Sequence, residues 1–218
     1  MKATFSDFAY CGAAISGIVL IGLAAVGFCV HPLTERYFGA YYPIADFVML
    51  LVAYGLVSAV VLRLLLACKK IEPGDYSMDS PTFGFWKLLT VIHRLGQAAL
   101  LPFTAIFLRP LVARLFGARV GRDVAIGGRI DDPYLTTLGD GAVLGNNSLV
   151  AASMIVAGRF TIGPVRIGVG ATVGANAIVL PGTELGEGAQ LLGGSIVVAG
   201  TRIPAGEVWR GNPARKWQ

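Results

Sequence analysis

Few side chains in this 218-residue sequence can carry out chemistry, and their spacing limits what that chemistry can be. The three cysteines, Cys11, Cys29 and Cys68, all fall inside apolar runs and have no CxxC spacing. The two histidines are His31 and His93. Zinc sites and disulfide frameworks need closely spaced sets of such residues, so we expect no metal and no disulfide.

The composition indicates the class of protein that must position any such site. Hydrophobic residues make up 55% of the chain and charged residues only 14%. An average soluble domain has about 25% charged residues, so a disordered chain and an ordinary soluble enzyme are excluded and a membrane protein is favoured. Residues 1–119 hold ten Lys/Arg and six Asp/Glu, against eight and seven in residues 120–218. The excess positive charge therefore lies in the apolar half. The polar half has no cluster of Lys and Arg interleaved with aromatic residues, so we expect no nucleic-acid partner.

Two apolar runs predict membrane-spanning helices. Residues 8–30 carry no charge, and residues 47–68 carry only Arg63, whose side chain can extend to the headgroups. At 1.5 Å per residue the first run is about 34 Å long, enough to cross a hydrocarbon core of about 30 Å. A cleaved signal peptide is the alternative for the first run, although its apolar region would be shorter, about 7–15 residues.

The stretch after the second run is basic and predicts the orientation. It contains Lys69, Lys70, Lys87, Arg94, Arg109, Arg114 and Arg119. Because positively charged flanks stay in the cytoplasm, we expect the following domain on the cytoplasmic side of the inner membrane, in contact with lipid. Residues 83–101 have apolar side chains at helical spacing and predict an interfacial helix, with a re-entrant or third span over 95–108 as the alternative. Residues 111–116 predict a short helix that ends at Gly117, which completes a membrane anchor over residues 1–117.

The second half of the chain has a six-residue period. Ile, Leu or Val occupies 13 of 15 hexad positions. These positions are Val120, Ile126, Leu138, Leu144, Val150 and Val156, then Ile167, Val173, Val179, Leu185, Leu191, Val197 and Ile203, with Asp132 and Trp209 as the exceptions. Glycine often follows the aliphatic residue. A hexapeptide repeat of this kind is typical of a parallel β-helix, in which the aliphatic residue points inward.

The repeat therefore predicts a domain over residues 118–218. Three hexads make one triangular coil, so the series corresponds to about five coils stacked at about 4.8 Å. The interval from Val156 to Ile167 is one residue short of two hexads, so residues 157–166 are expected to leave the prism as an external loop. An ordinary β-sandwich is the alternative, but its strands do not keep a fixed period. The expected fold is an α-helical membrane half of two spans plus an interfacial helix, followed by an all-β left-handed parallel β-helix.

This half resembles the left-handed β-helix hexapeptide-repeat acyltransferases. The resemblance covers about residues 115–216 and rests on GARVGRDV (117–124), LGDGAVLGNNSLV (138–150), GPVRIGVGATVGANAIVLPGTELGEGA (163–189) and IPAGEVWRGNPAR (203–215). The apolar half is similar to the anchors of membrane-bound members, including those at the ends of some peptide synthetases.

The resemblance implies a homotrimer that binds acetyl-CoA or another acyl-CoA in the clefts between prisms. It implies acyl transfer to a hydroxyl or an amine, with a histidine as general base. Asn147 stands where the family has an asparagine that places the acceptor or the base, and Ser153 stands where related membrane-bound sequences have the histidine. A serine has little basicity near neutral pH, which puts catalysis in doubt. His93 would have to reach a prism cleft to replace the base, and Asp131, Asp132 and Asp140 are expected to form turns.

The resemblance also suggests which residues contact the cofactor. Glycine- and alanine-rich coils allow the backbone to approach the pantetheine arm, and guanidinium groups pair with phosphates. The residues carried over are Gly174, Ala175, Asn176, Gly193, Gly194, Arg202, Arg210, Asn212, Pro213, Arg215 and Lys216.

Two functions follow. The first is a membrane-anchored, acyl-CoA-dependent transferase that acts on a glycan- or lipid-linked acceptor at the cytoplasmic face. The second is a non-catalytic trimer that serves as a scaffold or accessory subunit of a larger membrane complex, which the missing histidine favours. A γ-type carbonic anhydrase is excluded because it needs three zinc histidines.

Overall fold

The computed structural model describes residues 5–217, which divide into two compact units. One unit contains the described residues up to Lys70 together with Gly84–Phe103, and the other contains Ile71–Phe83 and the residues from Thr104 onward. This division differs from the single boundary expected after residue 117. The second unit includes both a segment that precedes most of α4 and the region from Thr104 onward, for reasons given below.

The first unit is helical. Its helices are α1 (Phe5–Ala25), a π-helical turn (Val26–Val30), α2 (His31–Phe38), a 3-10 turn (Gly39–Tyr41), α3 (Tyr42–Cys68), most of α4 (Pro81–Leu100) and a second 3-10 turn (Leu101–Phe103). Proline lies in the first turn of α2 and of α3, where its missing N–H leaves no helical hydrogen bond unmade. One helical stretch among the described residues, Asp7–Cys68, is long and apolar enough to cross a membrane, although length and composition alone would also admit a core helix or a signal sequence.

Close packing and a few polar contacts join these helices. A Cβ on Gly22 would lie 3.5 Å from Leu50 Cδ1, and one on Gly55 would overlap Leu100 of α4. Lys87 of α4 forms an ion pair with Asp7 of α1. The absence of side chains at the two glycines thus lets α1, α3 and α4 approach one another closely.

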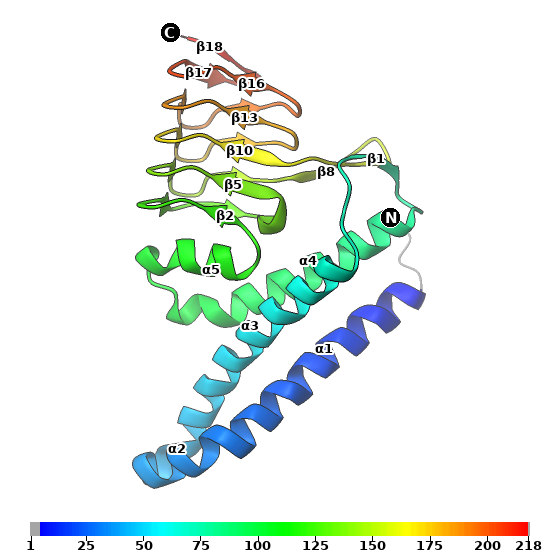
Figure 1. The fold of residues 1–218 in the computed structure, drawn as a ribbon, viewed down its shortest axis with the longest axis vertical. Helices are drawn as coiled ribbons and strands as arrows, with labels where there is room; N and C mark the ends of the chain where they lie inside the picture. The colour runs from blue at the N-terminus through cyan, green and yellow to red at the C-terminus, as the bar shows by residue number, and fades with distance from the viewer. Residues whose placement is uncertain (1–4, 218) are drawn as a thin grey trace. The chain divides into compact units, whose positions relative to one another are not determined.

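The second unit is a three-sided parallel β-helix (Figure 1). The β5 face contains β2 (Arg119–Val120), β5 (Thr136–Leu138), β10 (Val165–Ile167), β13 (Glu184–Leu185) and β16 (Arg202–Ile203). The β6 face contains β3 (Ala125–Ile126), β6 (Val143–Leu144), β11 (Thr172–Val173), β14 (Gln190–Leu191), β17 (Val208–Gly211) and β18 (Ala214–Lys216). The β7 face contains β4 (Arg129–Ile130), β7 (Leu149–Val150), β12 (Ile178–Val179) and β15 (Ile196–Val197).

The hexad residues form the core of this prism. Leu144, Val173 and Leu191, for example, are each at most 1% exposed and stack along the inside of the β6 face. Two residues on the expected series differ from it. Val156 is 59% exposed and lies outside the prism, whereas Asp132 keeps its inward position and is only 1% exposed.

The corners show why glycine is frequent. A Cβ on Gly174, which follows a core residue, would lie 2.4 Å from the backbone nitrogen of Gly193 in the next coil. The left-handed backbone that turns the corner occurs two residues later. Positive φ is found at Asp123, Gly141, Asn147, Gly170, Asn176, Gly182, Gly188, Gly194, Gly200 and Gly206. The first glycine is therefore needed for close approach between coils, and the second position favours glycine or asparagine for its dihedral angle.

The interruption in the repeat is a hairpin. β8 (Ser153–Val156) pairs antiparallel with β9 (Arg159–Ile162), and both residues of the connecting turn, Ala157 and Gly158, have positive φ. This is the geometry of a type I′ turn, which matches the twist of antiparallel strands. The chain thus leaves the prism over 153–162 rather than 157–166.

The connector before α4 completes a small sheet with this hairpin. β1 (Gly74–Ser77) pairs antiparallel with β9, and Thr161 donates a hydrogen bond to Asp75. Phe160 is fully buried, with its ring 5.1 Å from that of Phe83 and 6.4 Å from that of Tyr76. Strand pairing and this aromatic cluster explain why residues 71–83 belong to the second unit.

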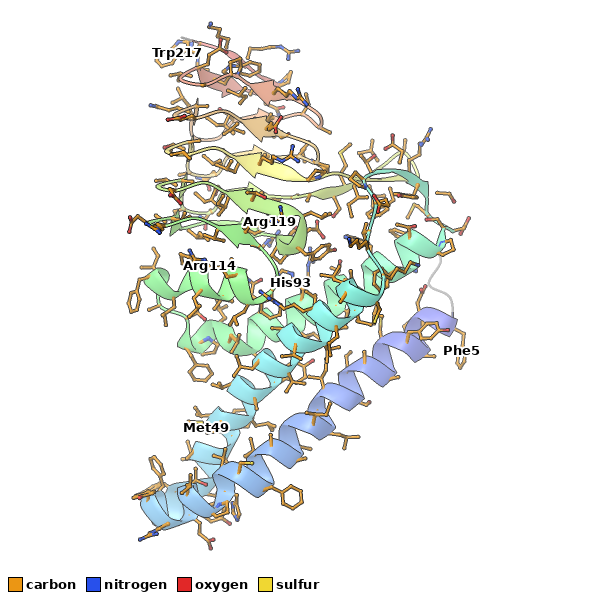
Figure 2. All side chains as sticks on the ribbon, viewed as in Figure 1. Phe5, Met49, His93, Arg114, Arg119 and Trp217 are labelled. Carbon is orange, nitrogen blue, oxygen red and sulfur yellow. The ribbon has the colours of Figure 1, made fainter. Side chains whose placement is uncertain are left out.

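Both ends of the β-helix are covered. At the N-terminal end, α5 (Arg109–Leu115) follows a 3-10 turn (Ile106–Leu108), and Arg109 donates to the carbonyl oxygens of Ile126 and Gly127 at 3.3 and 3.0 Å. Arg114 donates to the carbonyl oxygens of Val120 and Gly121. At the other end, the antiparallel β17–β18 hairpin carries Trp217 (Figure 2). The two arginines therefore satisfy carbonyl groups of the first coil that have no coil below them.

Candidate functional site

Most of the expected cofactor-contacting residues lie along one edge of the prism. Asn146–Asn147, Ala175–Asn176 and Gly193–Gly194 form successive levels of the corner between the β6 and β7 faces, which we call the small-residue column. The Asn176 N–H donates to the Asn146 carbonyl at 3.0 Å, and the Gly194 N–H donates to the Ala175 carbonyl at 2.8 Å. All six residues are exposed. The column offers backbone and small side chains to an extended ligand.

The column continues into the C-terminal hairpin. The Gly211 N–H, next to Asn212, donates to Ser195 Oγ at 3.1 Å, which ties the hairpin to the level of Gly194. The chain then turns at Pro213, and Arg210 pairs with Arg215 across the two strands. These residues, apart from Ser195, are exposed, so the structure brings the proposed phosphate contacts to the end of the column.

Two cations of this hairpin have partners of their own. The Arg210 guanidinium lies 4.7 Å from the Trp217 ring centre. Lys216 Nζ lies 2.7 Å from Glu207 Oε1, and Trp209 Nε1 donates to the other oxygen of Glu207 at 2.8 Å. The hydrogen bonds from Lys216 and Trp209 lower the pKa of the Glu207 carboxyl.

Arg202 does not lie at the corner that carries the small-residue column. It projects from β16 on the β5 face, where Glu184 pairs with it at 3.2 Å and with Arg166 at 2.9 Å. The β5 face is opposite the corner that carries the small-residue column. Within one prism, Arg202 is therefore not brought together with the other expected cofactor contacts.

A second polar cluster surrounds Ser153, where the hairpin leaves the prism. Ser153 Oγ donates to Asp132 Oδ2 at 2.6 Å, and Tyr134 Oη donates to Asp132 Oδ1 at 3.2 Å. Asp132 follows β4 and precedes the 3-10 turn Pro133–Leu135, and its backbone carbonyl accepts from Thr136 Oγ1 at 3.1 Å. Asp132 is thus not a simple surface turn, because its carboxylate is buried and accepts a hydrogen bond at each oxygen.

The negative charge of Asp132 affects the pKa of Tyr134. Burial, followed by the charge of Asp132 and the hydrogen bond to it, raises the pKa of Tyr134 well above its ordinary value. Sequence reasoning did not select Tyr134. The available signal was Asp132 itself, since a carboxylate at an inward position of an aliphatic series must find donors nearby.

The other expected site residues lie in other elements of the chain. Asn147 is exposed, and its φ of 56° is that of a corner residue, a role that it shares with Asn176. His93 lies in α4 and is 2% exposed. His31 lies at the start of α2, with its Nδ1 2.8 Å from Asp46 Oδ2. Asp140 is an exposed corner residue whose Oδ1 accepts from the Arg122 N–H at 2.8 Å.

Fold and column together describe a hexapeptide-repeat β-helix with an exposed edge of small residues. No family model matches the chain. It is 27% identical over 171 residues to the delta-poly-L-ornithine synthetase of Acinetobacter baumannii (strain AB307-0294), an alignment that covers 78% of this chain. The chain spans only 12% of the length of that protein.

Several solved acetyltransferases have similar structures. A maltose O-acetyltransferase from Clostridium difficile 630 is 20% identical with a TM-score of 0.47, covering 72% of this chain and 95% of its own. A hexapeptide-repeat-containing acetyltransferase from Vibrio cholerae O1 biovar eltor, complexed with acetyl coenzyme A, is 18% identical with a TM-score of 0.42, covering 47% and 60%. The resemblance expected from the hexad motifs is therefore confirmed.

Proposed function

We propose that this protein transfers an acyl group from acyl-CoA to a hydroxyl or amine of a glycan- or lipid-linked acceptor at the cytoplasmic face of a membrane. The observation that carries this proposal is the small-residue column, which is exposed along one corner of the prism and ends at a cationic hairpin. An extended pantetheine arm can lie against backbone of this kind, and its phosphates suit guanidinium and ammonium groups. The solved acetyltransferase bound to acetyl coenzyme A supports the same cofactor class.

The outer surface of the β7 face supports a homotrimer. Leu149, Ile178 and Ile196 are neighbours on this face in strict register, each before a buried strand residue, and Arg129 takes the same position in the first coil. The corresponding positions of the β5 face hold Arg166, Glu184 and Arg202, which form ion pairs in solvent. Packing of the apolar face against a neighbouring prism would bury the ladder and place the adjacent column in a cleft between subunits. In such a trimer Arg202 reaches a cofactor only from a neighbouring subunit.

The helical unit supports membrane anchoring. Side chains such as Phe8, Leu20, Phe28 and Leu64 are more than 60% exposed, which lipid would accommodate and water would not. The basic residues after the second apolar run favour a cytoplasmic β-helix. This arrangement would hold the column near acceptors that are themselves attached to lipid.

Calorimetric titration of the full chain in mild detergent with acetyl-CoA tests the proposal. We expect micromolar affinity, and a roughly tenfold loss, about 1.4 kcal/mol, for Arg215→Ala. Arg166→Ala, which removes a cation from the opposite face, is the matched control and should bind like the wild type. Dephospho-CoA should bind less tightly than acetyl-CoA if the hairpin cations hold the 3′-phosphate.

A non-catalytic trimeric scaffold or accessory subunit of a membrane complex is the second candidate. The observation in its favour is the position of the two histidines, neither of which falls in the hexapeptide repeat. Absence of acetyl-CoA binding up to millimolar concentration would overturn the transferase proposal and favour this one. Binding without turnover with any acceptor would favour a protein that has kept its cofactor cleft and lost its chemistry.

A further inference from the structure

The segment that caps the first coil of the β-helix has an apolar outer surface. Ile106 is 65% exposed, Phe107 76% and Leu111 52%, and we call these three residues the cap triplet. Ile106 and Phe107 are the two most exposed large apolar side chains among the described residues of the second unit. Because contact between neighbouring apolar side chains and water is unfavourable, such a patch indicates a surface that binds a partner.

The cap triplet is held rigidly. Leu108, between the 3-10 turn and α5, has right-handed helical dihedral angles, so Phe107 and Leu111 lie one turn apart on the same side. The opposite side is fixed to the prism, since Val112 is buried and Arg109 donates to two carbonyl oxygens of the first coil. A helical segment with one buried and one exposed apolar side has the form of an interfacial element.

Positive charge is concentrated at the same end of the prism. Residues 104–130 contain five arginines and one acidic residue, whereas residues 131–218 contain six Lys/Arg and six Asp/Glu. Arg119 and Arg122 are exposed on the first coil, against which α5 packs (Figure 2). The other acidic residues of the second unit lie in the connector before α4, at Glu72, Asp75 and Asp79. Exposed arginines around an apolar patch complement a membrane that contains anionic lipids.

The course of the chain favours a bilayer over a protein partner. The helical unit ends at Phe103, three residues before Ile106, so the cap triplet directly follows the segment for which we propose membrane anchoring. α4 ends at Leu100, and the residues up to Leu108 form only two short 3-10 turns. A membrane-crossing helix needs about 20 residues, so this stretch can lie at the interface but cannot cross. Three apolar side chains bind lipid weakly alone, and tethering by the anchor raises their effective concentration.

We propose that the cap triplet inserts into an anionic leaflet, with Arg119 and Arg122 at the lipid phosphates, so that the first coil of the β-helix lies on the bilayer. This inference rests on the membrane anchoring in the proposed function and does not depend on acyl transfer.

The contact would give the small-residue column a direction. The column begins at Asn146–Asn147 in the second coil and ends at the C-terminal hairpin. With the first coil on the bilayer, the second-coil level lies nearer the lipid and the cationic hairpin lies further away. An acyl-CoA with its phosphates at the hairpin would then direct its acyl end toward the leaflet from which a lipid-linked acceptor approaches.

Spin labels on the full chain in proteoliposomes test the inference. The three native cysteines are replaced by alanine, and one labelled cysteine is introduced by Phe107→Cys or, as a second position, by Ile106→Cys. Oxygen, which partitions into hydrocarbon, and a water-soluble nickel chelate report where each label lies. In vesicles of phosphatidylcholine and phosphatidylglycerol we expect preferential access of oxygen, with the label about 5–10 Å inside the headgroup–acyl boundary. Val169→Cys, at a 51% exposed corner of the third coil, is the matched control and should be open to the chelate.

Charge variants test the role of anionic lipid. Arg119→Gln combined with Arg122→Gln should move the label at position 107 toward the chelate, and so should high salt or omission of phosphatidylglycerol. Arg159→Gln combined with Arg166→Gln removes the same number of cations from later parts of the unit and should leave the label in place. Unchanged depth without phosphatidylglycerol, or in the Arg119 and Arg122 variant, would overturn the assignment to anionic lipid.

A label on the anchor distinguishes this inference from the proposed function. Leu64→Cys reports on α3, where the native side chain is 61% exposed. Oxygen access at position 64 with chelate access at 107 overturns the cap contact alone. Shielding of position 107 from both reagents would show that protein covers the cap triplet, either the helical unit or a second copy, and would also overturn it. Chelate access at position 64 overturns membrane anchoring together with this inference, while calorimetry with acetyl-CoA tests the transferase proposal separately.

Discussion

Ser153 Oγ lies 2.6 Å from Asp132 Oδ2, although the two residues are 21 positions apart in the chain. The two residues lie on neighbouring coils at the same corner of the prism: the Asp131 N–H donates to the carbonyl of Val150 in the next coil, which places Asp132 beside the point where β8 begins. The hydroxyl that stands where the resemblance implies a histidine is therefore held by a buried carboxylate. The contact fixes the direction of the serine hydroxyl, which donates to the carboxylate.

Titration of Tyr134 reports on the charge of Asp132. Its phenol should ionise at higher pH than the other tyrosines, and Asp132→Asn should bring that ionisation to lower pH, because the variant removes the negative charge but not the burial. Absorbance at alkaline pH, compared with Tyr134→Phe, isolates this residue. An unchanged titration in Asp132→Asn would show that the carboxylate is not charged beside the phenol.

The same shift predicts how stability depends on pH. The folded state holds the Tyr134 proton above a pH of about 10, where the unfolded chain loses it, so the unfolded state binds fewer protons. The free energy of unfolding contributed by this residue should then fall as pH rises above about 10, by at most about 1.4 kcal/mol per pH unit. Tyr134→Phe should flatten this dependence in thermal unfolding experiments.

Glu207 should stabilise the C-terminal hairpin only when it is ionised. Its pKa is lowered through hydrogen bonds from Lys216 and Trp209, so its contribution is present above the unfolded-state pKa, near 4.3, and is lost as pH falls through the folded value. Glu207→Gln should lower the thermal midpoint at pH 7, and the difference from the wild type should vanish at strongly acid pH. Glu187→Gln, at an exposed corner, is the control; a difference that persists in acid would contradict the prediction.

Two corner glycines should respond differently to substitution. Gly174→Ala places a Cβ 2.4 Å from the Gly193 nitrogen and should destabilise the β-helix by about 2–4 kcal/mol. Gly194→Asn should be nearly neutral, because Asn176 one coil away and Asn147 two coils away adopt the same left-handed conformation, and the space around Gly194 is open. Denaturant unfolding measures both. A tolerated Gly174→Ala would show that neighbouring coils can separate.

The apolar ladder should determine the oligomeric state. Ile178→Glu introduces a charge into the middle of the β7 face and should convert a trimer into monomers, measured by light scattering with correction for detergent. Thr137→Glu, at the corresponding outward position of the β5 face, should leave the mass unchanged. A wild-type monomer, or a trimer that survives Ile178→Glu, would remove the proposed cleft beside the small-residue column.

The sequence by itself determined the repeating part of this protein. A six-residue period of aliphatic residues is local information, since each hexad specifies one short strand and one corner, and stacking follows from the burial of identical faces. The same information identified the corner residues Gly174, Asn176 and Gly194 as neighbours, because equal spacing puts them at one edge. The helices over the apolar runs were likewise predictable from length and composition.

Only the tertiary structure decided the features that break the repeat. Pairing of β1 with β9, capping of the first coil by Arg109 and the contact between Asp132 and Ser153 join segments whose separations follow no period. Each depends on which edge, carbonyl or charge is left unsatisfied once the coils have stacked, and that is a property of the assembled prism rather than of any local run. The sequence marked Asp132 as an exception, and the fold supplied the hydroxyl groups that donate to its carboxylate.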